Sequence, residues 1–176
     1  MSSLSILAVD LSLTATGYAC GSGLSDLDVG TIKTTLRGWE RIRFIRKAIM
    51  QRARCVDLVI AEGYSFGSPG RLVYAGELGG IIRYELFERG IPFVDVPPAT
   101  LKKYSTGKGN AKKIDMVVAA RERFGFTHST DDNECDAYLL WAMARQAYGH
   151  PIAKVPALQA AVVEKIEWPR LEVAAA

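Results

Sequence analysis

The feature that most constrains this chain is an acidic residue at the end of each of two short apolar segments. Asp10 follows the apolar run 4–9, and Glu62 follows the run 58–61. Runs of this length and composition predict buried β-strands. An ionised carboxylate costs several kcal/mol to bury unless it is paired, hydrogen-bonded or bound to a metal ion. Both acids therefore need partners, although each one alone could accept a hydrogen bond from a nearby loop amide.

The rest of the hydrophobic pattern alternates strands with helices. Strands are predicted over 4–10, 15–20, 28–34, 57–62 and 91–96, the first two forming a hairpin. Helices are predicted over 37–55, 72–89, 99–104 and 111–124, followed by a last helix that opens at 130–136. With 176 residues, the chain suits one α/β domain. We expect this domain over 1–149, with a tail extension over 150–176 that packs on it or trails from it.

The segment 37–55 predicts an amphipathic helix. Its predicted buried face consists of apolar residues at helical spacing, namely Trp39, Ile42, Ile45, Ile49 and Met50. Its exterior is basic and includes Arg41, Arg43, Arg46 and Lys47. A charged exterior of this kind is usually only a solvated helix face, so it is a weak indication of a binding surface.

Two further acids lie at the start of the last helix. Asp131 is predicted as its N-cap, with Glu134 completing a capping box. Asp132 and Asp136 are four residues apart and share one helix face. Asp132 alone is also explained as an ordinary first-turn acid. Asp136 lies beyond the cap and precedes an apolar run, so capping does not account for it.

The four acids Asp10, Glu62, Asp132 and Asp136 can converge on one spot. Clustered carboxylates repel one another unless cations lie among them. An oxygen-only ligand set without His or Cys favours Mg²⁺, or Mn²⁺ in its place, over zinc. Two such ions about 3.5–4 Å apart can activate a water and stabilise the leaving oxygen in phosphodiester cleavage. The acids therefore predict nuclease chemistry.

A glycine-containing loop over 106–110 carries a cluster of lysines that fits a nucleic-acid substrate. Lysines on such a loop can contact a phosphate backbone without reading bases, although the loop could equally be a solvated surface. The cluster consists of Lys102, Lys103, Lys108, Lys112 and Lys113. Aromatic residues after Glu62, namely Tyr64, Phe66 and Tyr74, could stack on or wedge between bases, or simply pack.

Composition narrows the class of protein. No apolar run approaches the ~18–20 residues of a membrane span, and the N-terminus has no secretory signal pattern. The three cysteines lack metal-binding spacing and are predicted to be core thiols in a reducing compartment. We therefore expect a cytoplasmic protein without membrane association. The net charge of +3 is mild, so DNA binding must depend on where the basic residues lie.

From Ile6 to about Ala147, these motifs resemble the RuvC-type Holliday junction resolvases of the ribonuclease H-like superfamily. The specific parts are 96–103, with its Pro-Pro-Ala-Thr-Leu-Lys-Lys end, and 106–113, with its Thr-Gly-x-Gly-x-Ala-x-Lys pattern. The resemblance implies a five-stranded mixed β-sheet flanked by helices on both faces. It also implies a two-metal site, a homodimer and paired nicking of four-way DNA junctions.

The resemblance transfers the first acid to Asp10, the second to Glu62 and the last to Asp136, with junction contacts at Lys108, Lys112 or Lys113. The family has an acid or histidine three residues before the last Asp, where this chain has Asn133. Because an asparagine ligates only through a neutral carbonyl, Asp132 is predicted as the fourth ligand, with Asn133 as its substitute. The tail and the segment 62–80 match cellular enzymes loosely. They favour a viral or otherwise divergent member, which could also cut forks or flaps.

Two other functions remain open on the sequence. Asp10 followed by Ser12, Thr14, Thr16 and Gly17 also resembles the phosphate-binding hairpin of actin-like ATPases and sugar kinases, but those proteins need two such domains. A junction-binding protein without catalysis is the other alternative. We expect a Mg²⁺-dependent endodeoxyribonuclease that resolves branched DNA.

Overall fold

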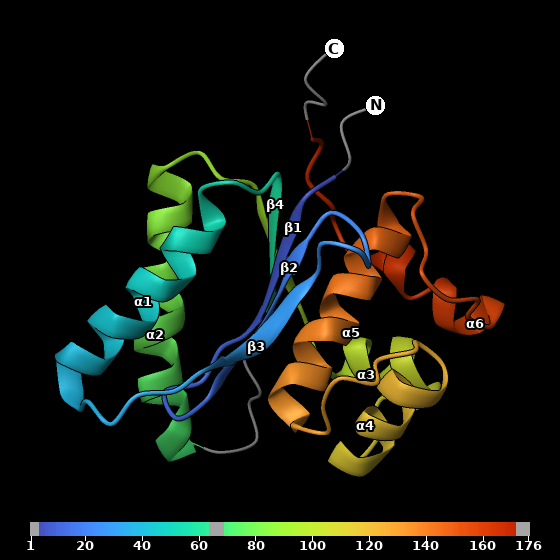
Figure 1. The fold of residues 1–176 in the computed structure, drawn as a ribbon, viewed down its shortest axis with the longest axis horizontal. Helices are drawn as coiled ribbons and strands as arrows, with labels where there is room; N and C mark the ends of the chain where they lie inside the picture. Colours follow the sequence, from blue (N-terminus) through green and yellow to red (C-terminus); the bar gives the residue numbers. More distant parts are fainter. Residues whose placement is uncertain (1–3, 64–68, 172–176) are drawn as a thin grey trace.

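A five-stranded mixed sheet lies at the centre of the computed structural model, which describes residues 4–63 and 69–171 (Figure 1). The strands are β1 (Ile6–Asp10), β2 (Thr16–Gly21), β3 (Asp28–Ile32), β4 (Leu58–Glu62) and β5 (Phe93–Val96). Their order across the sheet is β3-β2-β1-β4-β5. β2 is antiparallel to both of its neighbours, whereas β1, β4 and β5 run parallel. The prediction of a five-stranded mixed sheet is confirmed.

Helices cover both faces of the sheet, as predicted (Figure 1). α1 and α2 lie side by side on one face, and α5 lies against the other with α3 and α4 beside it. The bounds are α1 (Gly38–Ala53), α2 (Pro69–Glu88), α3 (Pro98–Thr106), α4 (Lys113–Glu122), α5 (Asp132–Ala147) and α6 (Ala157–Ala160), with a 3-10 turn over Val163–Lys165. Among the helices of the described segments, none has the length and apolarity of a membrane-crossing span.

The alternation of side chains along β1 divides the core in two. Leu7 and Val9 pack toward α1 and α2, whereas Ile6 and Ala8 pack toward α5. Because successive strand residues point to opposite faces, Asp10 belongs to the α5 face. β4 has the same pattern, so Glu62 belongs to the α5 face as well. The period of the strands therefore directs both predicted acids toward one helix.

Two details of the predicted packing are wrong. Trp39 was predicted on the buried face of α1, but its side chain is 70% exposed. It lies in the first turn of α1, and it borders a hollow together with Leu13 and Glu77 rather than packing in the core. Cys55 was predicted as a core thiol but is exposed, because it follows the end of α1; Cys135 is buried as predicted.

The start of α5 is tied to β3 by its acidic residues. Asp131 caps the helix as predicted, accepting a hydrogen bond from the Asn133 amide at 3.0 Å. The predicted capping box is wrong in its second half, because Glu134 accepts a hydrogen bond from Thr31 Oγ1 at 2.9 Å instead. Lys33 on the segment after β3 pairs with Asp131 at 3.3 Å. These contacts hold the N-terminus of α5 over the hairpin.

The tail packs on the α5 side of the domain. Val162 and Val163 are buried in the same core cluster as the inner face of α5. Trp168 Nε1 donates to the Val163 carbonyl at 2.8 Å, and Tyr148 Oη donates to the Pro169 carbonyl at 2.7 Å. The division of the chain into 1–149 and 150–176 stays a prediction.

Helix α5 makes backbone contact with the hairpin at Gly17. Gly17 lies opposite Asp10 in the β1–β2 ladder. A Cβ added at Gly17 would overlap the carbonyl oxygen of Asn133 and lie 2.5 Å from its carbonyl carbon. The neighbour is helix backbone, which cannot rotate away. A glycine at this position is therefore required for the close approach of α5.

We predict that Gly17→Ala destabilises the fold by about 2 kcal/mol or more. The added methyl group would overlap the helix backbone, which cannot move aside without disturbing the packing of α5. Gly80→Ala in α2 is the matched control, since a Cβ there meets nothing within 4 Å. It should stabilise the protein by about 0.5–1 kcal/mol through helix propensity. Thermal unfolding monitored by circular dichroism measures both, and equal effects of the two substitutions would contradict the contact.

Candidate active site

Asp10 and Glu62 lie side by side at the carboxyl ends of β1 and β4. The parallel register pairs Ala8 with Ile60 and Val9 with Ala61, so the next pair along the two strands is Asp10 and Glu62. Their side chains share a hydrogen bond. Two carboxyl groups this close repel each other when both are ionised, so the pair favours binding of a proton or a cation.

Helix α5 brings two further acids to this pair. α5 packs across β1 and β2, with Asp132 in its first turn and Asp136 one turn later. Asp136 acts electrostatically on Glu62, and Asp132 acts on Asp10. Oδ1 of Asp136 is buried without a hydrogen-bond partner among the described residues. The structure therefore brings the four predicted acids within electrostatic reach of one another, and one buried oxygen in the group is unsatisfied.

The environment opposes ionisation of three of these acids. Burial raises the pKa of Glu62 to about 9, and the charges of Asp10 and Asp136 add to the effect. Burial also raises the pKa of Asp136 to about 7, with a contribution from Asp10 and Asp132. The pKa of Asp10 is raised by burial, against the hydrogen bond from Glu62. Desolvation and like charge thus favour protons at this site when no cation is present.

Two of the predicted lysines lie beside the acids. Lys113, the first residue of α4, pairs with Asp132 across the gap between α4 and α5. The hydrogen bond to Asp132 raises the pKa of Lys113, and its charge lowers the pKa of Asp136. Lys102 on α3 also lowers the pKa of Glu62 and Asp136. Neither lysine fully offsets the effect of burial and like charge, because the pKa values of Glu62 and Asp136 are still raised overall.

Asn133 has other partners. Its side-chain Nδ2 donates to Asp131 Oδ1 at 2.8 Å and to Asp132 Oδ1 at 3.4 Å. Its backbone carbonyl lies against Gly17. Asp132 and Asp136 are the acids that act on Asp10 and Glu62. This arrangement supports Asp132 over Asn133 as the fourth ligand, and the choice between them stays a prediction.

The remaining predicted DNA-binding residues either are exposed on α3 and the segment after it or lie outside the described residues. Lys108 and Lys112 are exposed on the segment between α3 and α4. Lys103 lines a groove beside β5, together with Asp95 and Lys165. Tyr64 and Phe66 lie outside the described residues, as does the side chain of Tyr74.

A residue that the sequence did not single out packs on the basic loop. Gly107 ends α3 in a left-handed conformation, with φ of 85°, and a Cβ there would lie 2.8 Å from Nε2 of Gln159 on α6. Gln159 Oε1 accepts from Arg123 at 2.6 Å, and the same Arg123 nitrogen donates to the Ser105 carbonyl at 2.9 Å. A glutamine in a short tail helix carries no sequence signal for this contact, which depends on how the tail folds back.

The donor set fits a hard divalent cation, but the side chains do not form a finished site. Carboxylate oxygens, one of them buried and unpartnered, are the ligands that Mg²⁺ or Mn²⁺ prefers. Across residues 4–63 and 69–171, no three His, Cys, Asp or Glu side chains are gathered closely enough to hold a metal ion as they stand. Asp10 and Glu62 bond to each other, and Asp132 bonds to Lys113.

Comparison with known proteins gives relatives of one kind. The chain is 30% identical over 108 residues to the crossover junction endodeoxyribonuclease RuvC of Anaeromyxobacter sp. (strain K), covering 60% of this chain and 58% of that relative. It is 28% identical over 165 residues to the RuvC of Rhodopirellula baltica, covering 88% and 90%. The first match therefore spans little more than half of the relative. No protein-family model matches the chain.

Two solved structures share the fold. Thermus thermophilus RuvC superimposes with a TM-score of 0.60 at 21% identity, covering 84% of this chain and 98% of that one. The fowlpox virus resolvase, solved with its substrate Holliday junction DNA, gives 0.52 at 15% identity, covering 78% and 93%. The order of the strands and the helices on both faces define a ribonuclease H-like fold of the RuvC type. The chain is therefore similar in sequence to bacterial RuvC proteins and shares the fold of Thermus thermophilus RuvC.

We predict that the metal-free protein loses stability as the pH rises from about 5 to 9. The pKa of Glu62 is about 9 in the folded protein against 4.5 for the free side chain. The folded state therefore binds a proton that the unfolded state has released, and stability falls through this window by up to about 1.4 kcal/mol per pH unit. Thermal unfolding in EDTA should show this fall, and Glu62→Gln should reduce it. Equal pH slopes for the two proteins would contradict the assignment.

We also predict that Gln159→Ala loosens the lysine-bearing loop. The substitution removes the acceptor for Arg123 and the contact with Gly107. Limited trypsin digestion followed by mass spectrometry should show faster cleavage after Lys108. Leu158→Ala is the matched control, because Leu158 is the adjacent residue and is 82% exposed. An unchanged cleavage rate at Lys108 would mean that Gln159 does not restrain the loop.

Proposed function

We propose that the protein is a Mg²⁺-dependent, structure-selective endodeoxyribonuclease that resolves Holliday junctions and other branched DNA. One observation carries the proposal: the strand-end acids Asp10 and Glu62 meet beside a buried, unpartnered oxygen of Asp136. A fold optimised only for stability would not gather carboxyl groups that raise one another's pKa. Distant homology to crossover junction endodeoxyribonucleases supports the same activity.

Four side chains would hold the cations, namely Asp10, Glu62, Asp132 and Asp136. Asp10 is central, because it bonds to Glu62 and interacts with Asp132. Two Mg²⁺ ions, or Mn²⁺ in their place, would supply an activated water and stabilise the leaving oxygen in phosphodiester hydrolysis. The residues of this chain would hold the scissile phosphate near those carboxylates. Glu62 and Asp136, whose pKa values are raised, would release their protons to solvent when the cations bind.

The lysines would provide the electrostatic part of substrate binding. Lys102 and Lys113 lie beside the acids, so each can neutralise a phosphate positioned there. Lys108 and Lys112 are exposed on the adjacent segment and can contact the backbone further along the strand. Contacts of this kind position DNA without reading its sequence, which suits an enzyme that recognises the shape of a branch. Lys103, Tyr64 and Phe66 stay predicted contacts.

We propose a homodimer, since paired nicking of a four-way junction needs two active sites. An exposed stripe on α2 supports the dimer, because Tyr84 and Phe87 are spaced about one helical turn apart. Tyr84 is 65% exposed and Phe87 is 71% exposed. Large exposed aromatic side chains of this kind are typical of protein interfaces. The RuvC-like fold shared with a viral resolvase fits a viral or otherwise divergent member.

We predict that the wild type nicks a synthetic four-way junction in Mg²⁺ and that Asp10→Asn reduces the rate by about 100-fold or more. Gel electrophoresis of end-labelled strands measures the cleavage. Glu122→Gln is the control, because Glu122 is an exposed acid on α4 and its substitution should leave the rate unchanged.

Each other outcome of this assay identifies a different error. Equal cleavage by the wild type and Asp10→Asn would mean that the site is misassigned. Junction binding without cleavage in Mg²⁺ or Mn²⁺ would support a junction-binding protein that has no catalysis. Thermal stabilisation by ATP, with no effect of junction DNA, would support the actin-like alternative.

A further inference from the structure

Trp39 is one of the two most exposed aromatic side chains among the described residues, with Phe87 on α2. It lies in the first turn of α1 and is 70% exposed. The turn is preceded by Leu36, which is 38% exposed, and is followed by Phe44 at 43%. An indole is expensive to leave in water unless it has a partner, and it offers a large flat face for stacking. The sequence pattern predicted this residue in the core, so its exposure requires another explanation.

Basic side chains surround Trp39 on the exterior of α1. Arg43 and Lys47 follow it at intervals of four residues, so the three form one exposed stripe along the helix. Arg37, just before the helix, is exposed as well. Between residues 37 and 54 the sequence has one acid, Glu40, and its carboxylate is paired with Arg43 at 3.1 Å. The stripe therefore combines an aromatic face with a strong excess of positive charge.

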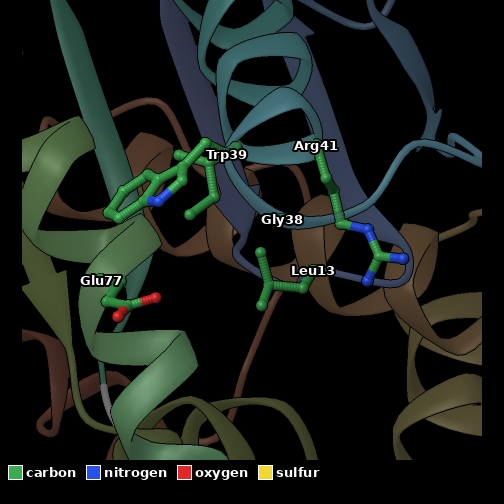
Figure 2. Close-up of a pocket in the computed structure, with 6 residues that line it drawn as sticks. Leu13, Gly38, Trp39, Arg41 and Glu77 are labelled. Carbon is green, nitrogen blue, oxygen red and sulfur yellow. The ribbon is translucent and has the colours of Figure 1, made fainter.

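A hollow of about 400 Å³ lies beside Trp39, between α1, α2 and the loop after β1. Figure 2 shows the indole extending toward Glu77 of α2, while Arg41 points to the other side of Leu13. Leu13 is three residues after Asp10 in the β1–β2 loop. Leu13 thus places the hollow near the end of β1 on the α1–α2 side, whereas Asp10 and Glu62 belong to the α5 face of the sheet. The Glu77 carboxylate can accept hydrogen bonds from base amino groups.

The charge of the stripe identifies the kind of occupant. A two-fold contact of this stripe with its counterpart on a second copy would bring like charges together, which disfavours the self-contact. A DNA strand supplies the complementary phosphates. Duplex DNA keeps its base faces stacked inside, whereas a strand next to a branch exposes unpaired bases that an aromatic ring can bind.

We infer that Trp39, with Arg43 and Lys47, forms a binding site for an unpaired nucleotide and its adjacent phosphates, on a single DNA strand beside the branch. Trp39 stacks on the base, and the two basic side chains bind the backbone that runs along α1. This site lies apart from the lysine-bearing loop, which is on the other face of the sheet. The inference rests on the proposed function and deepens it, because it specifies which part of a branched substrate contacts α1.

The test measures binding of an unlabelled single-stranded oligonucleotide in EDTA, where no cleavage occurs. Tryptophan fluorescence should be quenched on binding in the wild type and not in Trp39→Phe, since Trp141 is buried and Trp168 is partly buried. Trp39→Ala should weaken binding about fivefold or more, and Trp39→Phe should weaken it less, because a phenyl ring still stacks. Arg43→Gln should lower the slope of log affinity against log salt by about one.

Leu24→Ala is the matched control. Leu24 is 62% exposed and lies between β2 and β3, at the opposite end of the sheet. Its substitution should leave quenching and affinity unchanged. Equal affinity of the wild type and Trp39→Ala, or unchanged quenching in Trp39→Phe, would overturn the inference. A shift in oligomeric state with Trp39→Ala, without any change in DNA affinity, would assign the residue to a protein interface and overturn it as well.

These results are separate from those for the proposed function. If the wild type cleaves junctions and the Trp39 variants bind DNA normally, the inference fails and the nuclease assignment stands. If Trp39 fluorescence reports DNA binding and the wild type does not cleave in Mg²⁺, the inference stands and the nuclease assignment fails. If the wild type binds no DNA, both are overturned.

Discussion

The candidate site depends on the backbone contact between helix α5 and strand β2 at Gly17. Asn133 in the first turn of α5 lies so close to this glycine that a methyl group would not fit between them. Asp10 is the residue paired with Gly17 in the hairpin. The approach that needs a glycine is therefore the same approach that brings Asp136 to the strand-end acids. The hydrogen bond between Thr31 and Glu134 fixes the helix in this position.

The packing that stabilises the fold leaves its carboxyl groups in an unfavourable environment. Burial and like charge raise the pKa of Glu62 and Asp136, and the pKa of Lys113 is raised through its hydrogen bond to Asp132. The carboxylate oxygens of such a site can bind either protons or cations, so the two compete for the same atoms. Proton release and cation binding are thus linked at one place. Stability and the proposed cation-dependent activity should for this reason respond to pH in opposite directions.

Much of the candidate site could be predicted from the spacing of residues within single strands and helices. The period of two along β1 and β4, together with parallel pairing, places Asp10 and Glu62 on one face. A spacing of four places Asp132 and Asp136 on one helix face. The sequence pattern failed for residues whose burial and contacts depend on which other elements pack against them. Trp39 has the helical spacing of a core residue, but it lies in the first turn of α1 and borders an open hollow with Leu13 and Glu77. No sequence pattern identifies Gln159, because the fold of the tail is what brings it to its partners Arg123 and Gly107.

The sequence by itself determined which residues are acids at strand ends, which helix carries the second pair of acids, and that the candidate ligands offer oxygen atoms alone. These properties follow from local periodicity and side-chain chemistry. Tertiary structure decided which lysines reach the acids, that Asn133 bonds to the cap while Asp132 pairs with Lys113, and that Trp39 is exposed beside the loop after β1. The physical reason is that these outcomes depend on the spacing between packed elements, which no single segment of the chain encodes.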